Sequence, residues 1–276
     1  MSDTRRKSSA RIRMVAIDLD GTLLTSTKKI TAQTADALKA VATAGIKIVI
    51  ASARPPRSVR TFYEQLGLDT LTINYNGALI WDEPRKTPHT HLPMPPGLVR
   101  RIILFARDMF PEVLASCEVL DRWYTDRHDP AYTTETGRIF KPDLVAPMDE
   151  FLGEPVTKLM LLGDPDMITL LHDFVQTFFE QHCTAIRADP ELIQVMNSRA
   201  SKAIALKAVA GHYGVALEEV MAIGDAANDV PMLQAAGIAV AMDNAHPLVK
   251  EAADWIAPSN DNHGVAAALT KFVLQT

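Results

Sequence analysis

Short apolar runs alternate with helix-forming stretches along the first part of the chain, and this alternation limits the possible folds more than any other feature. Residues 14–17 form a continuous apolar run, as expected of a strand that is buried on both faces of a parallel sheet. Thr31 then opens a helical stretch that stops at Gly45, and residues 46–50 give the next strand. This succession predicts an α/β fold, a doubly wound parallel sheet of the Rossmann-like type.

The same alternation returns near the C-terminus after a long interruption. Ser201 opens a helix, and buried-strand patterns follow at residues 220–223 and 238–241. Between the two regions, five prolines lie within residues 84–96, where the rhythm of strands and helices stops. We interpret this polar stretch as a linker or hinge. Beyond it, helical patterns alternate with paired-strand patterns, and Asp166 is expected to cap a helix that starts at Met167. We therefore predict an α+β domain inserted into the sheet domain.

The length of the chain fits two domains. With 276 residues, the chain is near the size at which a single hydrophobic core stops growing. We expect a flexible tail at residues 1–12, a catalytic core made of residues 13–84 and 191–276, and an inserted α+β cap at residues 85–190.

Composition excludes several classes of protein. The net charge of −5 gives no broad basic surface for nucleic acid, and the one basic cluster lies in the N-terminal tail. No apolar run approaches the ~20 residues that span a bilayer, and no secretory signal is recognised. Cys117 and Cys183 are too few for a disulfide framework. We expect a soluble protein of the reducing cytoplasm that binds neither nucleic acid nor membrane.

Two carboxylates follow the first predicted strand directly. Asp18 and Asp20 are two residues apart in an extended segment, so both side chains can face the crevice beyond the strand's carboxyl end. Such close carboxylates stay ionised together when a cation compensates their charge, and Mg²⁺ is the usual choice beside phosphate. The alternative is a turn at the strand end with solvated acids.

A second acidic cluster follows the predicted strand at residues 220–223. Asp225 and Asp229 lie in the sequence Gly-Asp-Ala-Ala-Asn-Asp, at the point where a helix would begin. An Asp-rich helix start is also a common structural cap, which remains the alternative reading of this cluster.

Two further positions suit phosphate binding. Ser52 lies at a strand-to-helix junction, where a hydroxyl and free backbone N–H groups can cradle an anion; the alternative is a plain N-cap serine. Lys202 follows the helix-opening Ser201 and offers a compact ammonium group for phosphate oxygens, although most lysines are merely solvated.

In this order, the four stretches resemble the haloacid dehalogenase superfamily, and more closely its Cof-type hydrolases with a large C2B cap. The resemblance covers nearly the whole chain. Beyond the four stretches, it includes residues 76–78, 241–245 and 261–266. The usual Thr-Gly-Arg or Ser-Gly-Arg motif is Ser52-Ala53-Arg54 here, so phosphate binding there requires a turn that accepts a Cβ. The usual Lys-Gly is Lys202-Ala203.

The resemblance implies a magnesium-dependent phosphatase that acts on small, sugar phosphate-like metabolites. Asp18 would be the nucleophile, Asp20 the general acid and base, and Lys202 a catalytic cation. Mg²⁺ would be held by Asp18, the backbone carbonyl of Asp20, and Asp225, with support from Asp229. The phosphoryl group or substrate would be bound by Leu19, Ser52, Ala53, Asn76, Asn228 and Lys202.

The cap is expected to select the leaving group. Arg122, Trp123, Tyr124 and His128 are candidates for this, although Trp123 and Tyr124 also suit ordinary packing. Three other functions remain open: a phosphomutase, a non-catalytic phospho-acceptor domain, and a binding protein without catalysis. The residue Asp20 argues against the phospho-acceptor, which has no use for an acid–base carboxylate two positions after its aspartate.

Overall fold

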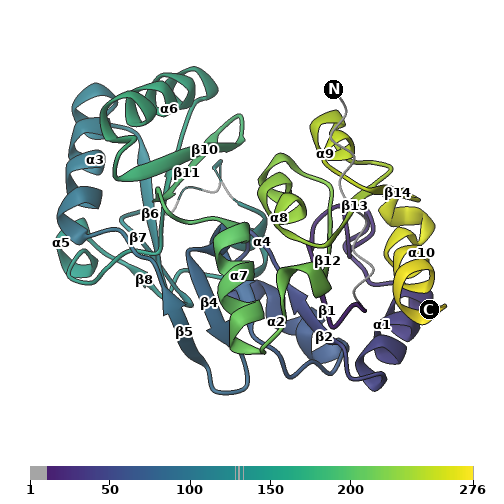
Figure 1. Ribbon diagram of the computed structural model, residues 1–276. Coiled ribbons are helices and arrows are strands. Elements are labelled where there is room, and N and C mark those ends of the chain that lie inside the picture. The colour runs from purple at the N-terminus through teal and green to yellow at the C-terminus, as the bar shows by residue number, and fades with distance from the viewer. Residues whose placement is uncertain (1–10, 128, 130, 133, 276) are drawn as a thin grey trace. The chain divides into compact units, whose positions relative to one another are not determined.

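The computed structural model describes residues 11–127, 129, 131–132 and 134–275, and these form two compact units (Figure 1). The first unit runs up to Ala53 and continues with Val59–His89 and the chain from Ser201 onward. The second unit consists of Arg54–Ser58 and Thr90–Ala200. The tail predicted at residues 1–12 falls almost entirely outside the described residues.

This division differs from the sequence prediction at its second boundary, which we placed after residue 190. Residues 191–200 belong to the second unit because strand β11 (Leu192–Asn197) pairs with both of its neighbours there. The first boundary also differs, since the division lies after His89 instead of after residue 84.

A five-stranded parallel sheet forms the centre of the first unit and confirms the doubly wound α/β prediction. Its strands in spatial order are β14 (Trp255–Ala257), β13 (Ile238–Met242), β12 (Val220–Gly224), β1 (Met14–Ile17) and β2 (Lys47–Ile50). The strands β1 and β12 are fully buried, as their continuous apolar sequences require.

The register of this sheet aligns the strand ends. Ile17, the last residue of β1, is paired with Ile223 of β12 on one side and with Ile50 of β2 on the other. The segments that follow these three strands therefore leave the sheet at one edge, which is where open α/β sheets bind ligands.

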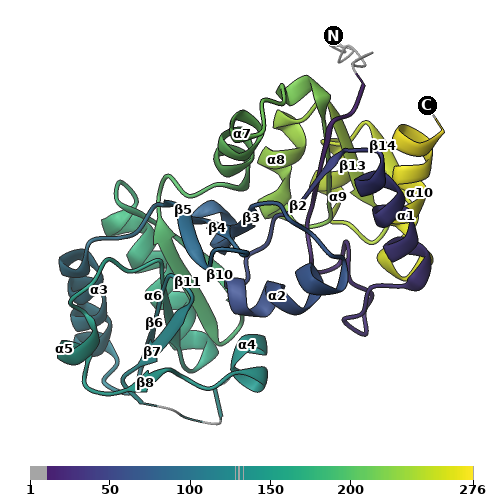
Figure 2. The same ribbon diagram turned by 90° about the horizontal axis from the view of Figure 1, so that it is seen from below.

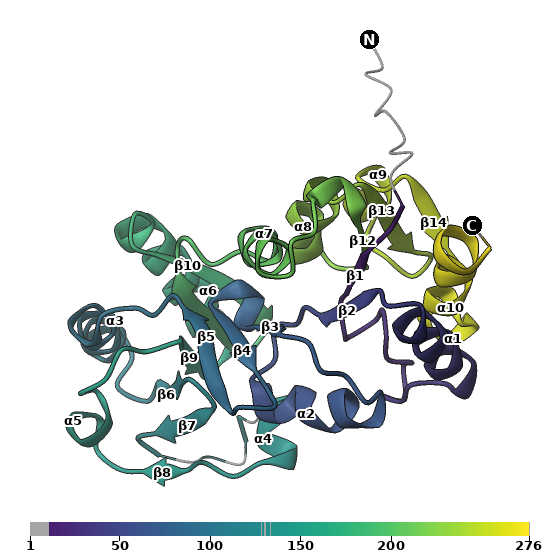
Figure 3. The same cartoon turned by 60° about the horizontal axis from the view of Figure 1, so that its bottom comes forward.

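Helices cover both faces of this sheet. Figure 3 shows α7, α8 and α9 on one face and α1 and α10 on the other, and α1 lies beside α10 in Figures 1 and 2. The helices of the first unit are α1 (Ala32–Thr43), α7 (Lys202–His212), α8 (Val230–Ala235), α9 (Pro247–Glu251) and α10 (Gly264–Leu269), while α2 (Pro56–Gln65) starts in the segment assigned to the second unit.

A small antiparallel sheet extends the first unit. It consists of β3 (Thr72–Asn74), β4 (Leu79–Asp82) and β5 (Thr87–His91), and a parallel bridge joins Ala51 to Ile73. The proline-rich stretch, which we interpreted as a linker, thus contains a strand. Pro88 is tolerated in β5 because this strand lies at the edge of its sheet.

The second unit has a six-stranded sheet, one face of which packs against three of the helices given below. Its strands in spatial order are β10 (Cys183–Asp189), β11, β9 (Lys158–Leu162), β6 (Leu114–Val119), β7 (Arg122–Thr125) and β8 (Leu144–Val145). Its helices are α3 (Pro96–Met109), α4 (Glu135–Ile139), α5 (Met148–Phe151) and α6 (Pro165–Phe179). Alternate strand residues pack with α3 and α6 into one core.

Two sequence expectations in this unit need correction or refinement. We expected Asp166 to cap a helix starting at Met167, but the capping carboxylate is that of Asp164, which accepts the backbone N–H of Asp166. The helix therefore begins at Pro165, whose missing N–H costs nothing at a first position. Trp123 and Tyr124 contribute to different clusters, since Trp123 packs with Met160 whereas Tyr124 packs with the helix-covered core. His128 lies outside the described residues.

Candidate active site

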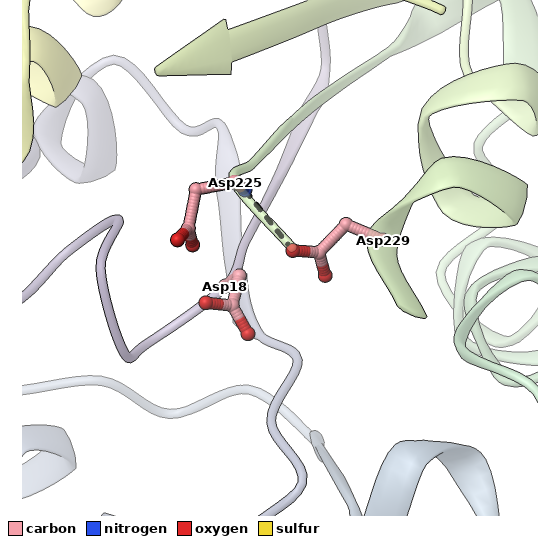
Figure 4. Close-up of side chains that lie close together, drawn as sticks. All are labelled: Asp18, Asp225 and Asp229. Carbon is pink, nitrogen blue, oxygen red and sulfur yellow. Dashed lines mark hydrogen bonds between the residues drawn. The ribbon is translucent and has the colours of Figure 1, made fainter. Parts of the chain in front are cut away.

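Three carboxylates converge at the carboxyl edge of the parallel sheet. One oxygen atom each of Asp18, Asp225 and Asp229 lies within 4.8 Å of the others (Figure 4). Asp18 directly follows β1, Asp225 directly follows β12, and Asp229 ends the short 3-10 helix Ala227–Asp229. The convergence of two acidic clusters that are about 200 residues apart is the arrangement that the sequence predicted.

Burial makes this arrangement costly for negative charge. Asp18 is only 6% exposed, and its removal from water raises its pKa well above the ordinary value. The charge of Asp229 raises the pKa further, while Lys202 opposes the shift. The folded chain therefore holds carboxylates where their charges are poorly compensated.

Lys202 supplies the positive charge within the cluster. Its Nζ donates to Oδ1 of Asp18 at 2.5 Å and to Oδ1 of Asp229 at 2.6 Å, and its side chain is fully buried. Burial alone would lower the pKa of Lys202, but the two carboxylates raise it, so the ammonium form is retained. The lysine is delivered by the first turn of α7, which Ser201 caps by accepting the N–H of Ala203.

Asp229 accepts hydrogen bonds from the loop that follows β12 as well as from Lys202. Its Oδ2 accepts the backbone N–H groups of Asp225 at 3.1 Å and Ala226 at 3.0 Å. Gly224 allows this close approach, because a Cβ at that position would lie 2.6 Å from the Asp229 carboxyl carbon. With both oxygens engaged by protein donors, Asp229 is better suited to support a metal ligand than to be one.

Asp225 is oriented by the segment that follows Asp18. The Thr22 hydroxyl donates to Oδ1 of Asp225 at 2.7 Å, and Gly21 has φ of +79° directly beside it. A Cβ on Gly21 would lie 2.3 Å from Oδ2 of Asp225. Burial raises the pKa of Asp225 to about 6, although the Thr22 hydrogen bond opposes this. Sequence reasoning missed Thr22, whose only signal was its place beside the two aspartates.

Asp20 points its carboxylate to a different partner. Its Oδ1 accepts a hydrogen bond from Nζ of Lys28 at 2.7 Å, and both side chains are partly exposed. Asp20 is not one of the three converging carboxylates, so its side chain does not lie with the acids that could hold a cation. Nothing in the sequence singled out Lys28.

The remaining predicted residues lie along the same edge. Ser52 follows β2, donates its N–H to Ile73 and accepts the N–H of Asn76 through its carbonyl. The Asn228 side-chain amide donates to Oδ1 of Asn76 at 2.8 Å, which links this loop to the second acidic cluster.

The two backbone donors of the prediction differ in exposure. Leu19 is fully buried between the two aspartates, whereas Ala53 is partly exposed. Nearby, Gly77 has φ of +97° and packs against the carbonyl of Ser201, so that a Cβ would lie 2.3 Å from this oxygen.

The donor set fits a hard divalent cation. Asp18 and Asp225 offer carboxylate oxygens, which are the ligands that Mg²⁺ prefers. Three buried or half-buried carboxylates converge beside one ammonium group, and burial raises the pKa values of Asp18 and Asp225, so a bound cation would stabilise their ionised forms.

Fold and site together define an α/β protein with an acidic site at the carboxyl edge of its parallel sheet, and comparison with known proteins gives its family. Residues 15–269 match the family model described as haloacid dehalogenase-like hydrolase. The 5-amino-6-(5-phospho-D-ribitylamino)uracil phosphatase YitU of Bacillus subtilis is 30% identical over 94% of this chain and 97% of its own length. Phosphatase YwpJ of the same organism is 27% identical over 92% and 98% of the two chains.

Comparison with solved structures gives the same family. A haloacid dehalogenase-like hydrolase from Bacteroides thetaiotaomicron has a TM-score of 0.86 at 26% identity, over 95% of this chain and 99% of its own. This chain belongs to the haloacid dehalogenase-like hydrolases, in their Cof-type subfamily, and is a phosphatase. Among the described residues, none of the helices has the length and apolar character to cross a membrane.

Proposed function

We propose that the protein is a magnesium-dependent phosphatase that forms an aspartyl-phosphate on Asp18. The observation that carries this proposal is the buried contact of Lys202 with Asp18 beside two further carboxylates. A carboxylate is a competent nucleophile when its site provides charge for the phosphoryl group, and covalent catalysis by Asp is well established in phosphoryl transfer.

In the first step, an Oδ atom of Asp18 attacks phosphorus, and the bond from phosphorus to the leaving oxygen breaks. Asp20, two residues away and outside the carboxylate cluster, gives its proton to this oxygen, so that an alcohol leaves. In the second step, Asp20 takes a proton from a water molecule that attacks phosphorus. Inorganic phosphate leaves and the Asp18 carboxylate is restored.

Lys202, Ser52 and Asn228 would bind the phosphoryl oxygens, with backbone N–H groups of Leu19 and Ala53. Asn76 holds Asn228 in place through the hydrogen bond between their side chains. Asp18, the Asp20 carbonyl and Asp225 would hold Mg²⁺, with Asp229 fixing the loop behind them. The bound ion would supply positive charge for the phosphoryl group in the transition state.

The substrate is proposed to be a small phosphorylated metabolite of the sugar-phosphate type. Support comes from YitU, whose name carries a phosphorylated ribityl group. We also propose a cytoplasmic location, supported by two free and buried cysteines, Cys117 and Cys183.

A panel of phosphorylated metabolites tests this function, with inorganic phosphate release measured in Mg²⁺ and in EDTA. We expect turnover that requires Mg²⁺ and is lost in Asp18→Asn. Unchanged turnover in Asp18→Asn would refute the nucleophile assignment. Formation of an isomeric phosphate ester without free phosphate would instead indicate a phosphomutase.

A further inference from the structure

Lys28 is presented to Asp20 by a tight turn. The Lys28 backbone N–H donates to the Thr25 carbonyl at 2.8 Å, and the Thr25 N–H donates to the Lys29 carbonyl at 2.9 Å. Lys28 itself has φ of +58°, the left-handed conformation that few residues other than glycine adopt. This backbone directs the Lys28 ammonium to Oδ1 of Asp20 at 2.7 Å.

The turn is held by a segment distant in sequence. The Ser26 backbone N–H donates to Oδ1 of Asp261 at 2.8 Å, and the Asn260 side-chain amide donates to the Leu24 carbonyl at 2.8 Å. These two contacts hold the turn on both sides of Thr25, its first residue. Residues 261–266 were part of the family resemblance, but the proposed chemistry gives them no role.

A second asparagine connects this segment to the nucleophile loop. The Asn244 side-chain oxygen accepts the Asn260 backbone N–H at 3.0 Å, while its amide donates to the Gly21 carbonyl at 2.8 Å. Gly21 directly follows Asp20. Asn244 therefore ties the segment that holds the turn to the segment that carries the carboxylate.

The ion pair is too exposed to be explained by stability. The side chains of Lys28 and Asp20 are 45% and 35% exposed, and ion pairs in such surroundings add little to the folding free energy. An ion pair does, however, select one direction for a short carboxylate. Small misplacements of an acid–base group are costly, because proton transfer requires hydrogen-bond contact with the leaving oxygen.

We propose that Lys28 is a positioning residue that orients the Asp20 carboxylate, and that Asn244, Asn260 and Asp261 fix the turn that carries it. This inference rests on the acid–base role proposed above for Asp20. The positioning role of Lys28 would explain two motifs near the C-terminus, residues 241–245 and 261–266, to which the proposed chemistry gives no function.

Leaving-group dependence tests the proposal. An aryl phosphate such as p-nitrophenyl phosphate needs little protonation of its leaving oxygen, whereas an alkyl phosphate depends on it. We expect Lys28→Met to lower kcat about tenfold or more for the best alkyl phosphate of the panel, and less than about threefold for p-nitrophenyl phosphate. Lys28→Arg should restore much of the loss, and the exposed neighbour change Lys29→Met should cause none.

Two further variants separate positioning from a general structural effect. Asp261→Ala keeps Lys28 but releases the turn, so it should show the same selective loss. Adding Lys28→Met to Asp20→Asn should cost nothing more, because Lys28 acts through Asp20. An equal loss on both substrates, or a full additional loss in the double variant, would overturn the proposal.

A crystal structure of Lys28→Met makes the outcome independent of the proposed function. The Asp20 side chain should change its rotamer or become spread over several. An unchanged, single Asp20 rotamer would overturn the positioning role even if the enzyme is active. A changed rotamer in a protein that hydrolyses none of the phosphate esters would support positioning and refute the proposed function instead.

Discussion

Each unit of the chain contains a buried ionic cluster, and the two clusters differ in their balance of charge: carboxylates are in excess in the first and matched by cations in the second. In the first unit, three carboxylates converge, and the ammonium of Lys202 contacts two of them, those of Asp18 and Asp229. In the second unit, Arg57 and Lys158 flank the carboxylate of Glu118, with Nη2 of Arg57 at 2.7 Å from one Glu118 oxygen and 2.8 Å from the other. A second carboxylate, that of Asp121, lies 3.8 Å from Nη1 of Arg57.

In both clusters, burial is the main cause of the pKa shifts. In the first unit, burial raises the pKa values of Asp18 and Asp225. In the second unit burial lowers the pKa of Lys158 to about 8, with Arg57 adding to the shift and Glu118 opposing it. Burial alone thus does not mark a metal site. What marks it is an excess of carboxylates whose oxygens converge from separate loops.

The largest effects should come from changing one carboxylate in each cluster. Asp18→Asn should lower kcat by about 10⁴–10⁶, since it removes the nucleophile, with little loss of stability because the charged form is already disfavoured. Glu118→Gln should instead lower the free energy of unfolding by about 3–5 kcal/mol, because it removes the carboxylate that contacts the buried Arg57 through both oxygens and leaves the more distant Asp121 beside it. Steady-state kinetics and chemical denaturation measure both.

The exposed residue Asp36 supplies the control, and Asp36→Asn should change neither quantity. The comparison fails if Asp18→Asn keeps full turnover.

The two buried lysines provide the next test. Lys202→Met leaves Asp18 and Asp229 without their shared cation and should cost about 3–5 kcal/mol of unfolding free energy in the absence of metal. Lys158→Met should cost clearly less, because the fold already disfavours the charged form of that lysine. Denaturation midpoints of the two variants, measured side by side, decide the point. Equal losses would mean that the charge balance of the clusters does not matter.

Two glycines separate backbone strain from the shape of the site. Gly21 and Gly45 both have φ of +79°, but only at Gly21 would a Cβ meet the Asp225 carboxylate. Each change to Ala should cost about 1–3 kcal/mol through strain. Only Gly21→Ala should also weaken Mg²⁺ binding, as measured by calorimetry. Equal Mg²⁺ affinities of the two variants would refute the role of this close approach.

The smallest expected effect is that of pH on the first cluster. Since folding raises the pKa of Asp225, its protonated form stabilises the metal-free protein at low pH, and this contribution is lost as pH rises through about 6. Mg²⁺ requires the ionised carboxylate, of which about one tenth remains at pH 5. The dissociation constant for Mg²⁺ should therefore be about tenfold higher at pH 5 than at pH 7.5. A pH-independent constant would contradict this.

Much of the fold could be predicted from local patterns. The runs that became β1 and β12 are apolar throughout because both faces of their sheet are covered, and Ser201 marks a helix start by its own side chain. Our predicted start of α6 was wrong because Asp164 and Asp166 are equally good capping residues by type, so the sequence alone does not distinguish them. β5 was missed because only a strand at a sheet edge tolerates its proline.

The sequence by itself determined which residues can do chemistry and on which strand ends they lie. Asp18, Asp20 and Asp225 were identifiable from their types and their places after apolar runs, and Lys202 was identifiable from its place after the helix-opening Ser201. Only the tertiary structure decided how these groups share their contacts: Lys202 lies between two carboxylates, Thr22 orients Asp225, and Lys28 reaches Asp20. The reason is physical, since local patterns report the burial and direction of a segment, whereas partners from distant segments are set by sheet register and loop packing.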